Sequence, residues 1–160
     1  MKVLLYKIAS DILEVYWWIF RPKTYGVKIA LIGPDGIWLS RNSYFNDKKW
    51  NFHGGGYNPN KESALEAAIR ETDEELLYEG KLQIRKVCEY LHTAEYKRDH
   101  ITIFESKARG TFKPKNKEIA EIRYFKFIEL KDTYISRSVE KYLLHNSIEH
   151  GEIRFPELLV

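Results

Sequence analysis

The spacing of apolar residues changes several times along the chain, and each change marks a predicted element. Positions 27–32 form a short apolar run rich in β-branched residues, and Gly33-Pro34-Asp35-Gly36 separates it from a second run at 37–41. Two such runs joined by a glycine-proline turn predict a β-hairpin. Further strands are predicted at 50–52, 81–92, 101–108 and 122–128, with 81–92 and 101–108 forming a second hairpin.

Three segments show helical spacing instead. The first covers residues 1–20, has apolar side chains at positions 5, 8, 12, 15, 16 and 19, and ends at Arg21-Pro22. The second begins near Lys61 or Glu62 and has a predicted inward stripe of Leu65, Ala68, Ile69, Thr72 and Leu76. The third covers 136–146, with Val139, Tyr142, Leu143 and Leu144 inward. Strands with helices between and after them predict an α/β domain.

The N-terminal segment 1–22 is predicted to be an amphipathic helix outside the main domain, which covers 23–160. A signal peptide is excluded because Asp11 and Glu14 interrupt the apolar run and no small-residue cleavage site follows. We expect this helix to pack on the domain or on a second copy of the chain in a homodimer, because its polar face is not rich in lysine or arginine. Attachment to a membrane surface is the alternative, since Trp17, Trp18 and Lys7 suit an interface.

Composition narrows the class of protein. A chain of 160 residues with 44% apolar and 31% charged residues fits one soluble domain with its own core. The formal net charge of +3 is too small to indicate a nucleic-acid binder. The single cysteine, Cys88, excludes an internal disulfide and fits a cytoplasmic protein. No apolar run reaches the length of about 18 residues that a membrane span needs.

The candidate chemistry lies in the second helix and the loop before it. Gly54-Gly55-Gly56 opens the loop, and Glu71, Glu74 and Glu75 follow one another around one side of the helix. Carboxylates at this spacing repel each other, so they need a cation nearby. Mg²⁺ takes carboxylate oxygens and substrate phosphates, which makes it the simplest candidate. An ion pair between Glu62 and Arg70 would fix the loop against the helix.

The pattern Gly56-x5-Glu62-x7-Arg70-Glu71-x2-Glu74-Glu75 resembles the signature of the Nudix hydrolases. The resemblance covers about residues 24–145, including a strand-turn-strand before the glycines and Glu118-x2-Glu121 before an aromatic strand. It implies an α/β/α sandwich with a mixed central sheet. It also implies Mg²⁺-dependent cleavage, with Mn²⁺ able to substitute, of a nucleoside diphosphate linked to another moiety: a nucleotide sugar, a nucleoside triphosphate or a dinucleoside polyphosphate.

The resemblance also assigns roles by position. Glu71, Glu74 and Glu75 would hold the metal together with the carbonyl of Gly55 or a neighbouring glycine. Glu74 would orient or deprotonate the attacking water, and Arg70 would hold the carboxylates in place. Glu118 is the expected carboxylate from outside the helix, with Glu121 as second choice; the alternative for Glu118 is an ordinary loop carboxylate. Gly56 and Glu62 would be structural.

The chain departs from the family pattern at several positions. His53 replaces a frequent proline, Thr72 replaces a bulky aliphatic residue, and the loop before Glu62 is one residue longer than the commonest form. His53 is expected to be a structural loop residue, with contact to phosphate or metal as the alternative. Leu77 replaces a glycine that usually ends the helix, and leucine tolerates the left-handed C-cap poorly. We therefore expect the helix to continue past Leu77 and end at Gly80.

The sequence constrains the choice of substrate less than it constrains the class of reaction. Arg41 and Arg98 are candidates for phosphate contact, and Trp50 and Tyr96 for stacking on a base; a surface or packing role is the alternative for each. The absence of proline between Tyr78 and Lys113 argues against the ADP-ribose hydrolases, which often carry one beyond the signature. An ADP-ribose pyrophosphatase and a non-catalytic nucleotide-binding module are the alternatives to the general hydrolase assignment. A small nucleotide, and no nucleic-acid polymer, is the expected partner.

Overall fold

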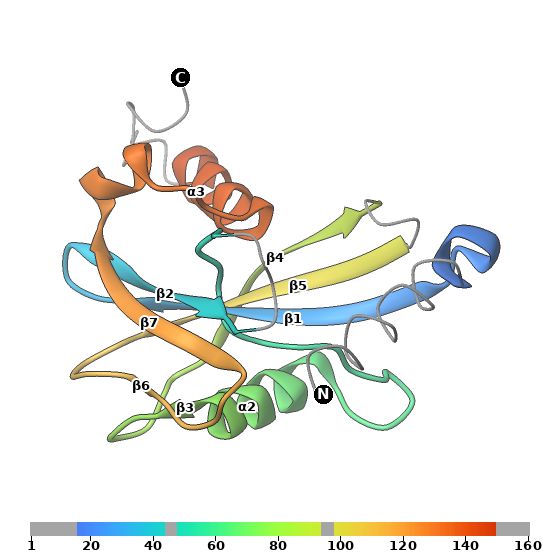
Figure 1. Cartoon of the computed structure of the whole chain (residues 1–160), viewed down its shortest axis with the longest axis horizontal. Helices are drawn as coiled ribbons and strands as arrows, with labels where there is room; N and C mark the ends of the chain where they lie inside the picture. Colours follow the sequence, from blue (N-terminus) through green and yellow to red (C-terminus); the bar gives the residue numbers. More distant parts are fainter. Residues whose placement is uncertain (1–15, 44–47, 94–97, 150–160) are drawn as a thin grey trace.

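The computed structural model describes residues 16–43, 48–93 and 98–149, and its centre is a five-stranded mixed sheet (Figure 1). The strand order is β4-β5-β1-β2-β7. Only β1 and β5 pair in parallel; the other neighbours are antiparallel, so both predicted hairpins are confirmed. The bounds are Lys23–Ile32 for β1, Gly36–Asn42 for β2, Arg85–His92 for β4, Arg98–Lys107 for β5 and Ile119–Lys126 for β7.

Two helices cover opposite faces of this sheet (Figure 1): α2, Ala64–Glu75, and α3, Arg137–Glu149. Strand β1 shows how the sequence specifies both layers, because its side chains alternate between the faces. Val27, Ile29 and Leu31 pack in one buried cluster with Ala67 and Ala68 of α2. Ala30 packs in the other cluster, together with Val139, Tyr142 and Leu143 of α3. The predicted α/β/α sandwich is confirmed.

The strand boundaries differ from the predicted ones in several places. β4 begins four residues later than expected, and the last two residues of the predicted strand 122–128 belong to a 3-10 helix, η2, Phe127–Asp132. The predicted strand at 50–52 is present as isolated bridges, with Asn51 opposite Ser40 and His53 opposite Ile29. These bridges attach the segment before the glycines to the centre of the sheet.

Helix α2 begins later than the apolar spacing predicts. Ser63 is the N-cap: its hydroxyl accepts from the amide of Glu66 at 3.2 Å, and the Glu66 carboxylate accepts from the amide of Ser63 at 2.8 Å. This reciprocal capping box satisfies two amides that the first turn would leave unpaired. The capping sequence therefore determines the first residue of the helix, although Lys61 and Glu62 favour helical structure.

The prediction that α2 continues past Leu77 is wrong. The helix ends at Glu75, and Leu76–Leu77 form the short strand β3, which pairs with β6, Lys113–Pro114. The buried side chain of Leu76 anchors this turn in the core beside α2. Gly80 adopts a left-handed backbone with φ +92°, but it does so in the loop after β3. An extended C-cap thus replaces the left-handed one.

The predicted inward stripe of α2 is partly wrong. Ala68, Thr72 and Leu76 are buried, whereas Leu65 and Ile69 are 42% and 44% exposed. The residue that replaces them against the sheet is Ala67. Small side chains allow the helix to lie close to β1, so the face with the alanines, rather than the face with the larger aliphatic residues, is buried. In α3, Leu144 is likewise more exposed than predicted, at 39%.

Residues 16–20 are helical and precede β1, while the rest of the predicted N-terminal helix lies outside the described residues. In this turn Tyr16, Trp18, Ile19 and Phe20 are exposed. None of the helices in the described part of the chain has the length and apolar character that crossing a membrane requires.

Candidate functional site

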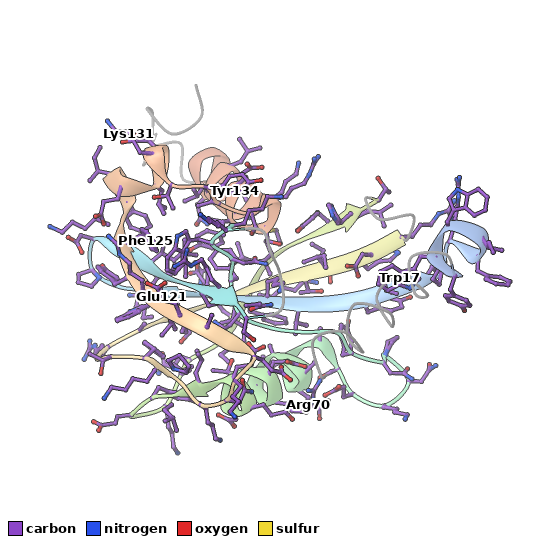
Figure 2. The ribbon with its side chains drawn as sticks, viewed as in Figure 1. Trp17, Arg70, Glu121, Phe125, Lys131 and Tyr134 are labelled. Atoms are coloured by element: carbon purple, nitrogen blue, oxygen red, sulfur yellow. The ribbon has the colours of Figure 1, made fainter. Side chains whose placement is uncertain are left out.

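Arg70 links the acidic side of α2 to the loop that precedes the helix (Figure 2). Its Nε and Nη2 donate to the two carboxylate oxygens of Glu62 at 3.1 and 2.9 Å. Its Nη1 donates to Glu71 at 2.7 Å and to Glu74 at 3.3 Å. The hydrogen bonds that Arg70 donates to Glu62, and secondarily to Glu71, raise the pKa of Arg70 above its ordinary value. The ion pair predicted from the spacing is present. The contacts of Arg70 are also those that the positioning role implied by the resemblance would need.

Glu75 points from the last turn of α2 toward the glycine-rich loop. Its Oε2 accepts a hydrogen bond from the amide of Gly54 at 3.0 Å. The side chain is buried, and this burial raises the pKa of Glu75 to about 7, against the opposing effects of the Gly54 hydrogen bond and of Lys28. A buried carboxylate with such a pKa is stabilised in its charged form when a cation approaches.

Lys28 was not among the residues expected to belong to the site. It extends from β1 to the glycine-rich loop, where its Nζ donates to the carbonyl of Gly54 at 3.1 Å. The sequence does carry a signal for it, because Lys28 interrupts an otherwise apolar, β-branched strand. A lysine in such a strand is rarely buried without a partner.

Gly55 lies directly against the carboxylate of Glu71. A Cβ atom at Gly55 would meet the carboxyl atoms of Glu71 at 2.6 Å, so only glycine leaves room for that carboxylate. The carbonyl of Gly55 accepts from the amide of Val27 at 2.9 Å, which attaches the loop to β1. Gly56 continues the attachment through a bridge to Gly26.

His53 is buried beneath the glycine-rich loop and contacts Thr72 of α2, with His53 Nε2 and Thr72 Oγ1 3.2 Å apart. Thr72 Oγ1 donates its proton to the carbonyl of Ala68 at 2.8 Å, so His53 Nε2 is the donor in this contact. Burial, and secondarily Lys28, lowers the pKa of His53 to about 3, which keeps the ring neutral. The burial of His53 and its contact with Thr72 are consistent with the structural role expected for it.

A loop between β6 and β7 closes the C-terminal end of α2. The amide of Lys115 donates to the carbonyl of Glu75 at 2.8 Å, and Asn116 Nδ2 donates to the carbonyl of Glu74 at 3.0 Å. The same loop holds Glu118 near Glu75, where its charge contributes to the raised pKa of Glu75. Sequence reasoning missed Asn116, since nothing in its neighbourhood along the chain marks it as a helix cap.

Glu121 and Arg41 form an ion pair between β7 and β2. The guanidinium of Arg41 also lies over the ring of Trp50, 4.5 Å from its centroid. Trp50 is only 8% exposed, and its ring packs edge-on against Phe125 at 4.6 Å (Glu121 and Phe125 are labelled in Figure 2). Glu121 is thus engaged by Arg41, which leaves Glu118 as the carboxylate nearer to the acidic helix.

One expected substrate contact, Arg98, begins away from this site. Arg98 begins β5, where its amide donates to the carbonyl of Pro22 and its register partner is Lys23. The glycine-rich loop attaches to β1 at Val27, through the carbonyl of Gly55. Lys23 lies four residues before Val27, so the backbone of β1 separates the two positions by about 13 Å. Tyr96 lies outside the described residues.

The carboxylates have the chemistry that a hard divalent cation requires, and several of them face the glycine-rich loop. Glu71 and Glu75 face the glycine-rich loop from successive turns of α2, and Glu118 approaches from the β6–β7 loop. All of the donors are oxygens, as Mg²⁺ and Mn²⁺ prefer. Within the described ranges, no three side chains that could ligate a metal are clustered as a ready-made site. Arg70 engages both Glu71 and Glu74.

Comparison with known proteins is consistent with this geometry. The family model described as NUDIX domain matches residues 22–144. A search of the curated proteins finds no match.

Several solved structures share the fold. The chain is similar to the MutT protein from Methanosarcina mazei Go1, with 18% identity, a TM-score of 0.69, and coverage of 83% of this chain and 99% of that one. It is similar to the E. coli ORF135 protein, with 17% identity, a TM-score of 0.64, and coverage of 85% and 95%. It is also similar to the NUDIX domain of Shewanella oneidensis NrtR complexed with ADP ribose, with 9% identity, a TM-score of 0.68, and coverage of 82% and 91%.

Proposed function

Since the chain belongs to the Nudix family of pyrophosphate-bond hydrolases, we propose that it is a divalent-metal-dependent pyrophosphohydrolase that cleaves a nucleoside diphosphate linked to another moiety. One observation carries the proposal. Glu71 and Glu75 lie against the Gly54-Gly55 segment, while Arg70 and Glu62 hold the acidic side of α2 to the same loop. Mg²⁺ is the proposed cofactor, and Mn²⁺ is expected to substitute.

The residues that would hold the metal are Glu71, Glu74 and Glu75, with Glu118 and a carbonyl of the Gly54-Gly55 segment. A bound cation would neutralise the diphosphate oxygens and lower the pKa of bound water. Glu74 is the proposed residue that orients or deprotonates the attacking water, since it is the most exposed of the three, with 57% of its side chain accessible. Arg70 keeps the neighbouring carboxylates in position.

Substrate recognition is proposed to involve Arg41 and Trp50. Arg41 is a cation at the end of β2, and its stacking on Trp50 and pairing with Glu121 fix the direction of its guanidinium. Arginine in such a fixed position is suited to phosphate. Trp50 supports Arg41 rather than offering an open ring, because it is almost fully buried. We leave Arg98 out of the proposed substrate site, because it begins β5 opposite Lys23, four residues along β1 from the attachment of the glycine-rich loop at Val27.

Several substrates suit this site. A nucleotide sugar, a nucleoside triphosphate and a dinucleoside polyphosphate each contain the required anhydride. ADP-ribose is the specific alternative, supported by the ADP ribose bound to the NrtR domain and by the ADP ribose pyrophosphatase named in the Francisella tularensis bifunctional protein, at 15% identity. The sequence has a single cysteine, Cys88, which cannot form an internal disulfide and supports a cytoplasmic location.

A screen of nucleotide substrates with Mg²⁺ or Mn²⁺ tests the proposal, with the Glu74→Gln and Glu75→Gln variants assayed in parallel. We expect metal-dependent product release that falls by about a hundredfold or more in Glu74→Gln. Absence of metal-dependent turnover with every substrate, or full activity in both variants, would contradict the enzyme assignment. Tight nucleotide binding without turnover would instead identify a non-catalytic binding module.

A further inference from the structure

The helical turn before β1 carries four exposed apolar side chains. Tyr16, Trp18, Ile19 and Phe20 are 48%, 60%, 57% and 65% exposed, and we call them the aromatic turn. The rings of Tyr16 and Phe20, one turn apart, pack on each other at 4.9 Å. In Figure 2 this turn, near Trp17, stands out beyond the end of the sheet. Exposed aromatic side chains gathered in one turn indicate a surface for interaction.

Cations lie where the aromatic turn leads into β1, and the fold brings one of them from a distant part of the sequence. Arg21 and Lys23 follow the turn directly and are exposed. The parallel pairing of β1 with β5 places the exposed Arg98 opposite Lys23. The neighbouring carboxylate of Asp99 accepts a hydrogen bond from Thr24 at 2.9 Å. We call Arg21, Lys23 and Arg98 the basic end.

This combination matches the chemistry of an anionic lipid surface. Tryptophan, tyrosine and phenylalanine partition into the region of the lipid headgroups, and nearby lysine and arginine are attracted to anionic headgroups. The sequence alone shows few cations on the polar face of the N-terminal helix. The structure supplies them from β1 and β5 instead. We propose that the aromatic turn and the basic end dock this protein on the surface of a membrane that contains anionic phospholipid.

A second copy of the chain fits this surface less well. Two-fold association through the aromatic turn would bring the same patch of each copy together. The three cations of one basic end would then face the three cations of the other, and like charges in an interface are unfavourable. An anionic lipid surface has the complementary charge.

Docking in this way leaves the candidate metal site in water. Gly55 attaches to β1 at Val27, whereas the basic end begins at Lys23 and extends away from it. A peripheral enzyme attached through this end would keep access to small nucleotides. The proposal does not depend on the hydrolase activity, so the two can fail independently.

Vesicle flotation of the full chain tests the proposal. The vesicles are phosphatidylcholine alone or contain about a third phosphatidylserine, an anionic lipid of cytoplasmic leaflets. We expect the protein to float with the anionic vesicles at least about tenfold more than with the neutral ones, and the bound fraction to fall as salt screens the cations. Trp18→Ser with Phe20→Ser should abolish flotation, and Arg21→Asn with Lys23→Gln should remove the preference for anionic lipid. Asparagine is chosen because Arg21 has a left-handed φ of 43°.

The matched control is Ile128→Ser, which removes an apolar side chain of similar exposure, 58%, from η2. This variant should float like the natural chain. Thermal unfolding checks that every variant is folded. The proposal is overturned if the natural chain does not float with anionic vesicles, or if the double aromatic variant floats equally well. A dimer in solution that the aromatic substitutions dissociate, without flotation, would assign the surface to a second copy of the chain.

Discussion

The contact between Gly55 and Glu71 offers the sharpest test of the metal site, because it depends on the absence of one carbon atom. In Gly55→Ala the added Cβ would meet the Glu71 carboxylate at 2.6 Å. The displaced atoms belong to the end of a flexible side chain, so the fold should tolerate the change while the carboxylate moves. We expect the affinity for Mn²⁺ to fall about tenfold or more, as for other changes that misplace a ligand. Isothermal titration calorimetry measures this.

Gly56→Ala is the matched control for that experiment. A Cβ at Gly56 has the carbonyl oxygen of Tyr25 as its nearest neighbour, at an ordinary contact distance of 3.7 Å. This variant should bind Mn²⁺ like the natural chain. Equal losses in both variants would show that the loop as a whole, rather than the placement of Glu71, controls metal binding.

Lys28 contributes a positive charge beside the carboxylates that are proposed to hold the metal. Its Nζ contacts the carbonyl of Gly54, and its charge acts on Glu75. In Lys28→Met the repulsion between this ammonium group and an incoming cation disappears. We expect Mn²⁺ to bind about fivefold more tightly, equivalent to about 1 kcal/mol, while Lys28→Arg remains close to the natural chain. Weaker binding in Lys28→Met would show that Lys28 matters more for the shape of the loop than for its charge.

His53 makes stability depend on pH in a defined direction. Its folded pKa of about 3 lies below the ordinary value of 6.5, so the unfolded chain binds a proton that the folded chain excludes. The stability contributed by neutral His53 is complete above pH 6.5 and is lost as the pH falls toward 3. Between these two pH values, His53 alone should lower the free energy of unfolding by up to about 1.4 kcal/mol for each pH unit of acidification.

Urea unfolding of His53→Gln between pH 7 and pH 4 checks this expectation. The variant should be less stable at pH 7, because it loses the fitted contact with Thr72, but its stability should fall less steeply with acid. His92→Gln, on the edge strand β4, is the control and should follow the natural chain. Parallel curves for His53→Gln and the natural chain would contradict a neutral, buried His53.

At the scale of elements, helix α2 shows which signals in the sequence are local and which are not. The ion pair of Glu62 with Arg70 follows from spacing, and so does the common side of the three glutamates. The first residue of α2 depends on the capping box at Ser63. This signal is local, but the prediction from apolar periodicity did not use it and placed the start near Lys61 or Glu62. The last residue depends on the pairing of Leu76 with Pro114, which lies 38 residues further along the chain. Periodicity within the helix contains no information on that partner.

The remaining parts of the site show the same limit. Glu118 was identified through the order of motifs in the family, whereas the capping of α2 by Asn116 needs the loop after β6 to be in place. His53 and Thr72 each depart from the family pattern, and only the structure shows that they contact each other. The two departures are therefore one feature: a polar contact between the loop and the helix where relatives often have proline and an aliphatic residue.

At the scale of the whole molecule, the central parallel pair β1–β5 organises both proposed functional surfaces. Near its middle, β1 holds the glycine-rich loop through Val27 and Ile29. At its start, the same pair gathers the basic end beside the aromatic turn. A mixed sheet between helices could be expected from the family resemblance. The meeting of Lys23 with Arg98 could not be read from either local sequence, since 75 residues separate them.

This arrangement predicts that residues 1–20 are dispensable for the fold of the domain. The described core begins at Val27, and β1 itself begins at Lys23. A chain that starts at Arg21 should therefore unfold within about 3 °C of the full chain, a shift that corresponds to about 1 kcal/mol for a domain of this size. It should also lose vesicle flotation. Calorimetry measures the unfolding temperature of both chains. A much larger loss of stability, with the chain still folded at low temperature, would show that the N-terminal segment packs on the domain, as the sequence led us to expect.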